Sequence, residues 1–120
     1  MRIVCLGGGP AGLYFSILMK KANPASDITV IERNQPDSTF GWGIVFSDKT
    51  MDGFRQDDPQ VVAEIERNFH HWDDVDVFFK DRRIVSGGHG FCGIGRLKLL
   101  QIFQARALEL GVKLQFATEF

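Results

Sequence analysis

The chain has 120 residues, a formal net charge of −1 and a hydrophobic content of 44%. This composition is typical of a globular protein and excludes an intrinsically disordered one. The near-zero net charge gives no electrostatic reason to expect binding to nucleic acid or to an anionic membrane, and no apolar run in the sequence approaches the ~20 residues of a membrane span.

The N-terminal segment predicts a strand, then a glycine-rich turn, then a helix. Residues 2–6 are mostly apolar, as in a buried parallel strand, and the periodicity of residues 13–21 indicates a helix. Between them, Gly7, Gly9 and Gly12 have the G-x-G-x-x-G spacing of a dinucleotide pyrophosphate site. Gly7 allows a tight turn, Gly9 lets a phosphate approach the main chain, and Gly12 lets the helix pack against the strand. Free N–H groups at the helix N-terminus are then available to the anion.

A second strand is predicted over residues 27–32, and it ends in an acid. Glu32 lies about 20 residues after Gly12, where a dinucleotide-binding fold has an acid for the ribose hydroxyls. Because a carboxylate accepts hydrogen bonds from a ribose diol and repels a 2′-phosphate, the site is predicted to take FAD or NAD rather than NADP. The alternative without a ligand is an ordinary βαβ turn with a glutamate on the surface.

Residues 33–95 form a long insertion before the next predicted crossover helix. A segment of this length is typical of regions that carry function or cover a ligand. We interpret the adjacent His70 and His71 as a solvated helix end, because neighbouring helical positions point about 100° apart. The elements expected in the insertion are a loop over 33–40, a short strand within 41–46, a helix from 47 to about 54, a helix from about 59 with Val62, Ile65, Phe69 and Trp72 on one face, a β-hairpin over 75–85 turning at 81–82, and a glycine-rich stretch over 87–95.

A strong helix is predicted from Arg96 to about residue 110, with Gly111 as its stop and a last strand over 112–116. The order predicts an α/β fold in which a parallel sheet carries the last strand beside the second. A cation at a helix start is disfavoured by the helix dipole, so Arg96 indicates either a nearby anionic ligand or a solvated arginine. Gly41-Trp42-Gly43 is explained either by backbone packed against a flat ring or by a turn with a half-buried tryptophan.

These segments together resemble the N-terminal part of the class A FAD-dependent aromatic monooxygenases, the flavoprotein hydroxylase family. The residues that carry the resemblance are Gly7 to Gly12, Glu32-Arg33, Gly41 to Ile44, Gly93 to Leu100 and Glu109 to Val112. The branch that looks most similar contains salicylyl-CoA 5-hydroxylase, 2-aminobenzoyl-CoA monooxygenase and an indole-hydroxylating relative. The resemblance implies a Rossmann-like FAD-binding βαβ unit with a second crossover helix and strand.

The resemblance also implies a role for individual residues. The FAD pyrophosphate would be held by Gly7, Gly9, Pro10, Ala11 and Gly12. Glu32 would bind the adenosine ribose, Arg33 would lie beside the adenine, and Arg96 would support the ribityl-pyrophosphate region. Gly41, Trp42 and Gly43 would approach the flavin. Many relatives have an arginine just before the Gly-x-Gly segment, where this chain has Ser38-Thr39-Phe40.

The expected function is the FAD-binding portion of an enzyme that hydroxylates an aromatic substrate, such as an aryl-CoA, with NAD(P)H and O2. Residues 1–120 would then be part of an FAD/NAD(P)-binding domain, with residues 33–95 as an insertion. The alternatives are the FAD domain of a flavin-dependent halogenase or reductase, or an isolated dinucleotide-binding module. A fragment of this kind is expected to be inactive alone and to self-associate through an exposed sheet edge.

Cys5 and Cys92 have neither a disulfide framework nor the ligand spacing of a metal site, so no metal is predicted. The apolar run at residues 3–6 is too short for a signal peptide and leads directly into the glycine-rich turn. We therefore expect a cytoplasmic protein.

Overall fold

The structure is a computed structural model that describes residues 1–120. It divides into two compact units. The first unit combines Met1–Trp42 with Arg96–Phe120, and the second unit is Gly43–Gly95. None of the helices in the chain is both long enough and apolar enough to cross a membrane.

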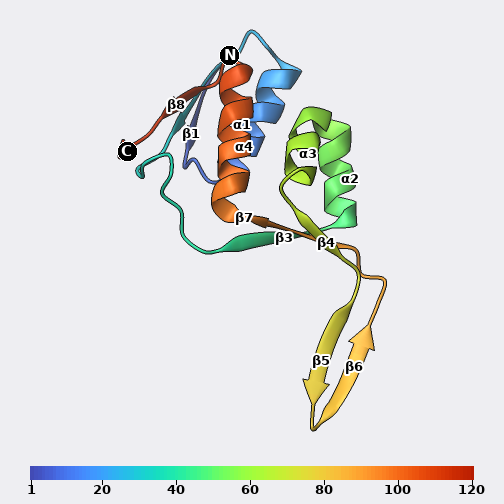
Figure 1. Cartoon of the computed structure of the whole chain (residues 1–120). Helices are drawn as coiled ribbons and strands as arrows, with labels where there is room; N and C mark the ends of the chain where they lie inside the picture. Colours follow the sequence, from blue (N-terminus) through green and yellow to red (C-terminus); the bar gives the residue numbers. More distant parts are fainter. The chain divides into compact units, whose positions relative to one another are not determined.

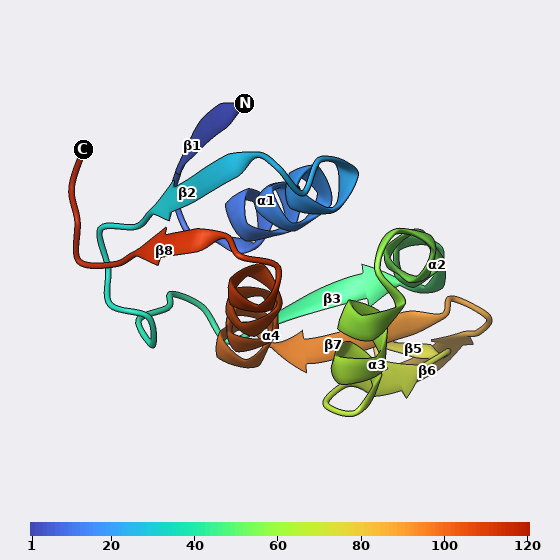
Figure 2. The same cartoon turned by 90° about the horizontal axis from the view of Figure 1, so that it is seen from above.

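The first unit is a parallel sheet with two helices on one side (Figures 1 and 2). Its strand order is β1-β2-β8, with β2 paired in parallel to both neighbours. This arrangement confirms the predicted parallel sheet and the predicted place of the last strand beside the second. The elements in chain order are β1 (Arg2–Leu6), α1 (Pro10–Ala22), β2 (Asp27–Ile31), α4 (Arg96–Glu109) and β8 (Lys113–Gln115).

The core of the first unit lies between the sheet and its two helices. The rings of Tyr14 on α1 and Phe103 on α4 stack with centroids 5.5 Å apart. The other face of the sheet is open, because Val4 and Leu6 on β1 are 53% and 58% exposed. The buried apolar side chains of this core include Leu13, Ile17, Ile28, Val30, Leu99, Phe103 and Ala107.

Both helices begin and end at residues suited to those positions. Pro10 occupies the first turn of α1, where its missing N–H leaves no hydrogen bond unmade. The α4 helix starts at Arg96, as predicted, and Gly111 follows it with a φ of +88°. The N–H of Val112 donates to the carbonyl of Ala107, and the N–H of Gly111 donates to Leu108, both at 2.9 Å. This pair of bonds is a Schellman motif, which fixes where the chain leaves the helix for β8.

The second unit contains two helices, a three-stranded antiparallel sheet and a separate hairpin. The sheet order is β3-β7-β4. Ser47 caps α2 by accepting from the N–H of Thr50, and Asp58 caps α3 by accepting from Gln60, both at 3.2 Å. The elements are β3 (Gly43–Ser47), α2 (Asp48–Asp57), α3 (Pro59–Glu66), β4 (His70–Trp72), β5 (Val75–Phe79), β6 (Arg82–Ser86) and β7 (Phe91–Gly95).

Two sequence predictions for the second unit are wrong. The α3 helix ends at Glu66, so Phe69 and Trp72 do not continue its apolar face, and His70-His71 is not a helix end. The residues from His70 to Trp72 instead pair with β7, and this pairing satisfies the backbone groups on the side of β7 that faces away from β3. No strand was predicted within the glycine-rich stretch, but residues 91–95 form the central strand of this sheet.

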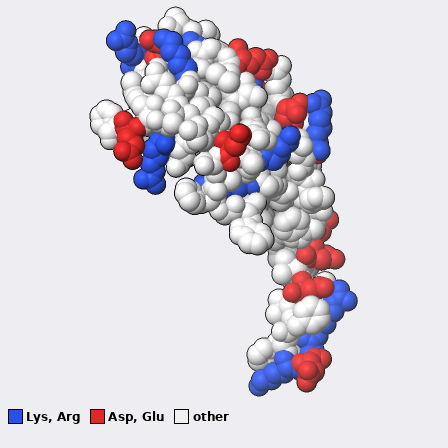
Figure 3. Space-filling view, turned by 60° about the vertical axis from the view of Figure 1, so that its left-hand side comes forward, with Lys and Arg blue, Asp and Glu red and all other residues white.

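The β5–β6 hairpin is paired only within itself. Its turn residues, Lys80 and Asp81, have φ values of 46° and 59°, one residue earlier than the predicted turn. Every residue of both strands is exposed, including the apolar Phe78 at 74%. Charges of both signs lie side by side on it (Figure 3), and Arg83 pairs with Asp76 at 2.7 Å.

Candidate functional site

The glycine turn between β1 and α1 depends on a close approach of two backbone segments. Gly7 has a φ of +102°, which favours glycine, and its N–H donates to the carbonyl of Ile31 at 2.8 Å. A Cβ placed on Gly12 would lie 2.2 Å from the carbonyl oxygen of Gly7. Only glycine therefore allows the first turn of α1 to lie against the strand end, as the spacing predicted.

The N-terminus of α1 is open to a ligand. Gly9 is the N-cap, no side chain caps the helix, and the first turn contains no acid. The N–H groups of Ala11 and Gly12 therefore have no helical acceptor, and the positive end of the helix dipole is not neutralised. A Cβ on Gly9 would meet nothing within 4 Å, so the space beside this turn is free. The geometry suits a phosphate or another anion.

Glu32 is tied directly to the glycine turn. Its Oε2 accepts from the N–H of Gly8 at 2.7 Å. Its Oε1 accepts from the backbone N–H and the side-chain Nδ2 of Asn34, both at 2.8 Å. The hydrogen bonds from the backbone of Asn34 and then of Gly8 lower the pKa of the Glu32 carboxyl below its ordinary value, with a smaller contribution from Arg33. The group is therefore held as a carboxylate at the end of β2.

Gly8 and Asn34 were not identified from the sequence. Gly8 is buried, and a Cβ on it would lie 3.0 Å from the Cβ of Glu32. The run of three glycines was the available signal, because the fingerprint itself requires no glycine at the second position. Asn34 gave no signal, since its contact with Glu32 depends on the turn after β2.

Arg96 contacts the loop that follows β2. Its Nε donates to Thr39 Oγ1 at 3.1 Å, and its backbone N–H donates to the carbonyl of Trp42 at 3.2 Å. Gly41 has a φ of +85°, and a Cβ on it would lie 3.8 Å from Arg96 Cδ. The guanidinium is half-buried and faces no carboxylate, so its terminal nitrogens are available to an anionic ligand.

Two hollows adjoin Glu32, and they share Asn34 and Phe40 in their walls. One lies between the glycine turn and residues 34–40 and reaches Arg96 and Gln104 on α4. The other runs along the ends of β1 and β2 past Arg33 to the C-terminal residues Thr118 and Phe120. The side chain of Gln104 donates to the carbonyl of Pro36 at 3.1 Å, which holds the loop that forms one wall.

The remaining predicted residues lie at different places. Pro10 and Ala11 form the start of α1 beside the turn, and Arg33 is exposed along the second hollow. Trp42 is 98% exposed and packs on nothing in the first unit, so it is not the half-buried tryptophan of the alternative interpretation. Gly43 belongs to the second unit, where it opens β3 opposite Gly95.

Comparison with known proteins gives relatives along nearly the whole chain. It is 41% identical over 119 residues to salicyloyl-CoA 5-hydroxylase of Streptomyces sp, covering 99% of this chain and 23% of that protein. It is 28% identical to 3-hydroxy-4-methyl-anthranilyl-[aryl-carrier protein] 5-monooxygenase of Streptosporangium sibiricum, covering 96% of this chain and 33% of that protein. No family model matches the chain.

Solved structures show the same fold. The tetrameric form of 2-methyl-3-hydroxypyridine-5-carboxylic acid oxygenase matches with a TM-score of 0.84 at 21% identity, over 98% of this chain and 32% of that one. CtdE, solved with FAD and a substrate, matches with a TM-score of 0.78 at 18% identity, over 99% of this chain and 30% of that one. The predicted resemblance to the flavoprotein hydroxylases is confirmed. This chain spans about a quarter to a third of the length of these two relatives and of the matched oxygenase structure.

Proposed function

We propose that this chain is the FAD-binding portion of a flavin-dependent monooxygenase that hydroxylates an aromatic substrate, an aryl-CoA thioester in particular, with NAD(P)H and O2. The observation that carries the proposal is the contact between Gly12 and Gly7, which holds an uncapped helix N-terminus beside a carboxylate suited to a ribose. The 41% identity to a salicyloyl-CoA 5-hydroxylase supports the substrate class.

The residues present fit an FAD molecule at its adenosine and pyrophosphate end. The β1-α1-β2 segment would act as a Rossmann-like unit in which Gly7, Gly9, Pro10, Ala11 and Gly12 surround the pyrophosphate. The bound flavin would supply reduction by NAD(P)H and activation of oxygen, and the protein would position and shield it. We place Arg96 near the ribityl-pyrophosphate region, and Gly41, Trp42 and Gly43 remain predictions for the flavin end.

Glu32 has a distinct task in this proposal. A carboxylate offers about two acceptor positions on each oxygen. Oε1 already accepts from two donors of Asn34, while Oε2 accepts only from Gly8. One position on Oε2 is therefore open to a ribose hydroxyl. The negative charge that binds this hydroxyl would repel a 2′-phosphate, so we expect an unphosphorylated adenosine ribose.

We also propose that residues 1–120 belong to one FAD-binding domain in which residues 33–95 are an insertion. We expect no turnover from these 120 residues alone, because they correspond to 23% of the salicyloyl-CoA 5-hydroxylase. Self-association is a further part of the proposal, since β1 and β8 are the edges of their sheet and one sheet face is open.

The experiment is to purify the full-length protein, record its flavin absorption and titrate the flavin-free form with FAD. We expect bound flavin in the wild type and a roughly tenfold or greater loss of FAD affinity in Glu32→Gln, which removes a charged acceptor. Glu109→Gln is the matched control, because Glu109 is an exposed acid paired with Arg106 at 2.9 Å. A full-length protein that carries no flavin and neither binds FAD nor is stabilised by it would overturn the proposal.

The alternatives predict different results. An isolated dinucleotide-binding module would bind FAD, NAD or ADP without any oxygenase activity in the full-length protein. A halogenase or reductase would bind FAD but would not hydroxylate an aromatic ring. The names of the matched relatives, all hydroxylases or monooxygenases, favour the first proposal over these.

A further inference from the structure

Three residues of different chemistry meet within the second unit. Asp48 begins α2, His71 lies in β4 and Cys92 lies in β7. Their ligating atoms all lie within 4.8 Å of one another. His71 Nε2 is 3.1 Å from Asp48 Oδ1, and Cys92 Sγ is 3.6 Å from the same oxygen. We propose that Asp48, His71 and Cys92 bind a divalent transition-metal ion of the zinc type.

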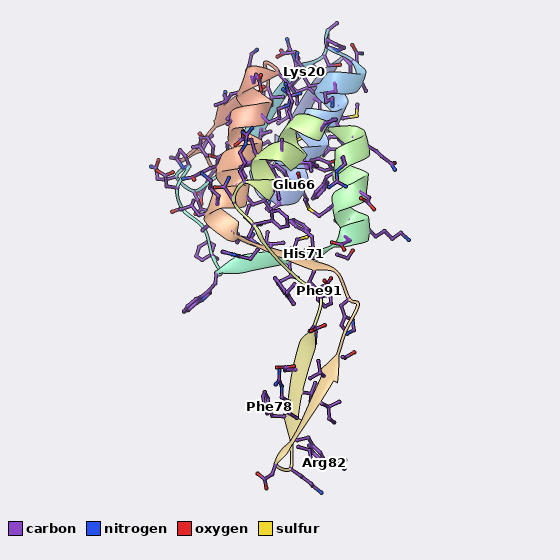
Figure 4. All side chains as sticks on the ribbon, turned by 45° about the vertical axis from the view of Figure 1, so that its right-hand side comes forward. Lys20, Glu66, His71, Phe78, Arg82 and Phe91 are labelled. Atoms are coloured by element: carbon purple, nitrogen blue, oxygen red, sulfur yellow. The ribbon has the colours of Figure 1, made fainter.

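The backbone places these side chains together. His71 and Cys92 are direct partners in the antiparallel register of β4 and β7, so their side chains leave the same face of the sheet. Asp48 is held beside the start of β7, because its N–H donates to the carbonyl of Gly90, the residue just before that strand, at 2.9 Å. Figure 4 shows His71 beside the first turn of α2. The cluster therefore depends on the sheet register and on the helix start, and not on flexible side chains alone.

Gly90 leaves the space that the carboxylate occupies. Its φ is +63°, and a Cβ on it would lie 2.2 Å from Asp48 Oδ2. Any larger residue at this position would force the Asp48 carboxylate to move.

The two separations from Asp48 Oδ1 suit tetrahedral coordination. Metal–ligand bonds of about 2.0 Å to nitrogen and oxygen and about 2.3 Å to sulfur place N and O about 3.3 Å apart, and S and O about 3.5 Å apart. The observed separations are 3.1 Å and 3.6 Å. A thiolate with an imidazole and a carboxylate is a donor set that zinc accepts, with water in the fourth position.

The surroundings of the cluster favour a cation and allow one to enter. The three residues line a hollow together with Asp52, Glu66 and Arg55. Both acids pair with Arg55 at 2.6 Å, so the positive charge of Arg55 is neutralised. The carboxylate of Asp73 is also near the cluster, with its Oδ1 4.0 Å from His71 Nε2. The side chains of Asp48 and His71 are 57% and 40% exposed, whereas Cys92 is buried.

A nucleophilic cysteine is a poorer explanation of the same residues. Asp48 Oδ1 accepts from the Cys92 thiol and also bonds to His71 Nε2, so the imidazole does not bond to the thiol as an activating base would.

The test is to titrate the metal-free full-length protein with Co2+ and with Zn2+. We expect one equivalent of Co2+ to produce a thiolate-to-cobalt charge-transfer band that Zn2+ abolishes. Cys92→Ser removes the sulfur ligand and must eliminate the band. Loss of an imidazole or carboxylate ligand, in His71→Ala or Asp48→Asn, should weaken Zn2+ binding by at least about tenfold to a hundredfold, the scale seen for groups that merely support ligands.

Two matched controls separate this site from other thiols and histidines. Cys5→Ser and His70→Ala alter a cysteine and a histidine outside the cluster, and both variants should keep the band and the affinity. Circular dichroism of each metal-free variant reports whether it is folded, since His71 and Asp48 are exposed and their replacement should leave the fold intact. A wild type without the band, a band that persists in Cys92→Ser, or a band lost in either control would overturn the proposal.

Discussion

Replacing Gly12 with alanine tests the packing of the glycine turn most directly. The added Cβ would lie 2.2 Å from the Gly7 carbonyl oxygen, well under the 3.0 Å below which real Cβ contacts are essentially never found. The helix or the turn must therefore move by about 1 Å. The helix cannot move freely, because Leu13 and Ile17 on α1 are fully buried in a packed core.

The expected cost follows from that displacement. Overpacking that forces backbone shifts in a well-packed region costs about 1–3 kcal/mol. With a urea m-value of about 1.5 kcal/mol per molar, a loss of about 2 kcal/mol lowers the unfolding midpoint by roughly 1.3 M. The assay is equilibrium urea unfolding of the wild type and of Gly12→Ala, followed by circular dichroism.

Gly9→Ala is the matched control for Gly12→Ala. Its φ is −73°, and a Cβ there would meet nothing within 4 Å. The weaker N-cap and the lower entropy of the unfolded chain oppose each other, so its stability should stay within about 0.5 kcal/mol of the wild type. If the pyrophosphate binds at this turn, Gly9→Ala should still weaken FAD binding by about tenfold or more, because the methyl group occupies the ligand's space. A Gly12→Ala protein as stable as Gly9→Ala would refute the packing argument.

Three further changes test other parts of the structure. The pKa of Glu32 is lowered in the folded state, so the stability that its carboxylate contributes is fully present above the ordinary value of 4.5 and is lost as the pH falls through the folded pKa. The difference in unfolding free energy between wild type and Glu32→Gln, measured by urea unfolding, should therefore narrow below pH 4.5. A difference that widens in acid would contradict this. In α2, the added Cβ of Gly53→Ala meets no atom within 4 Å, and this change should stabilise the chain by about 0.5–1 kcal/mol. Gly90→Ala should destabilise it by about 1–2 kcal/mol, because Gly90 has a positive φ and the added Cβ would clash with Asp48. Equal thermal midpoints of the two variants would show that neither effect operates. Asp58→Ala should cost about 1 kcal/mol through loss of the α3 cap, and Asp58→Asn should restore much of it in the same thermal assay.

The sequence predicted the first unit better than the second for a physical reason. The turn from Gly7 to Gly12 and the acid at Glu32 follow from local backbone rules, in which each residue's task is set by neighbours close in the chain. The helix from Arg96 was recognisable for the same reason, since its periodicity and its Gly111 stop are local. The contact of Asn34 with Glu32 depends on the turn after β2, and it became visible only in the structure.

In the second unit, tertiary pairing overrode the local pattern. Phe69 and Trp72 have helical spacing from Ile65, but pairing of residues 70–72 with β7 removes them from α3. The cluster of Asp48, His71 and Cys92 joins three elements through strand register, so no spacing in the sequence could reveal it. Ligand spacing along one segment identifies only sites built from that segment.

The isolated β5–β6 hairpin has a consequence for the dynamics of the chain. A two-stranded hairpin without a covering layer is only marginally stable, and its non-glycine turn residues at positive φ add strain. Its strands should therefore open far more often than β2, which is paired on both sides and carries the buried Ile28 and Val30. In a hydrogen-exchange experiment the amide protons of residues 75–86 should exchange early, while those of β2 should exchange only as the first unit unfolds. This chain would then hold two regions of very different local stability, one that resists opening at the candidate cofactor site and one that samples open conformations continually.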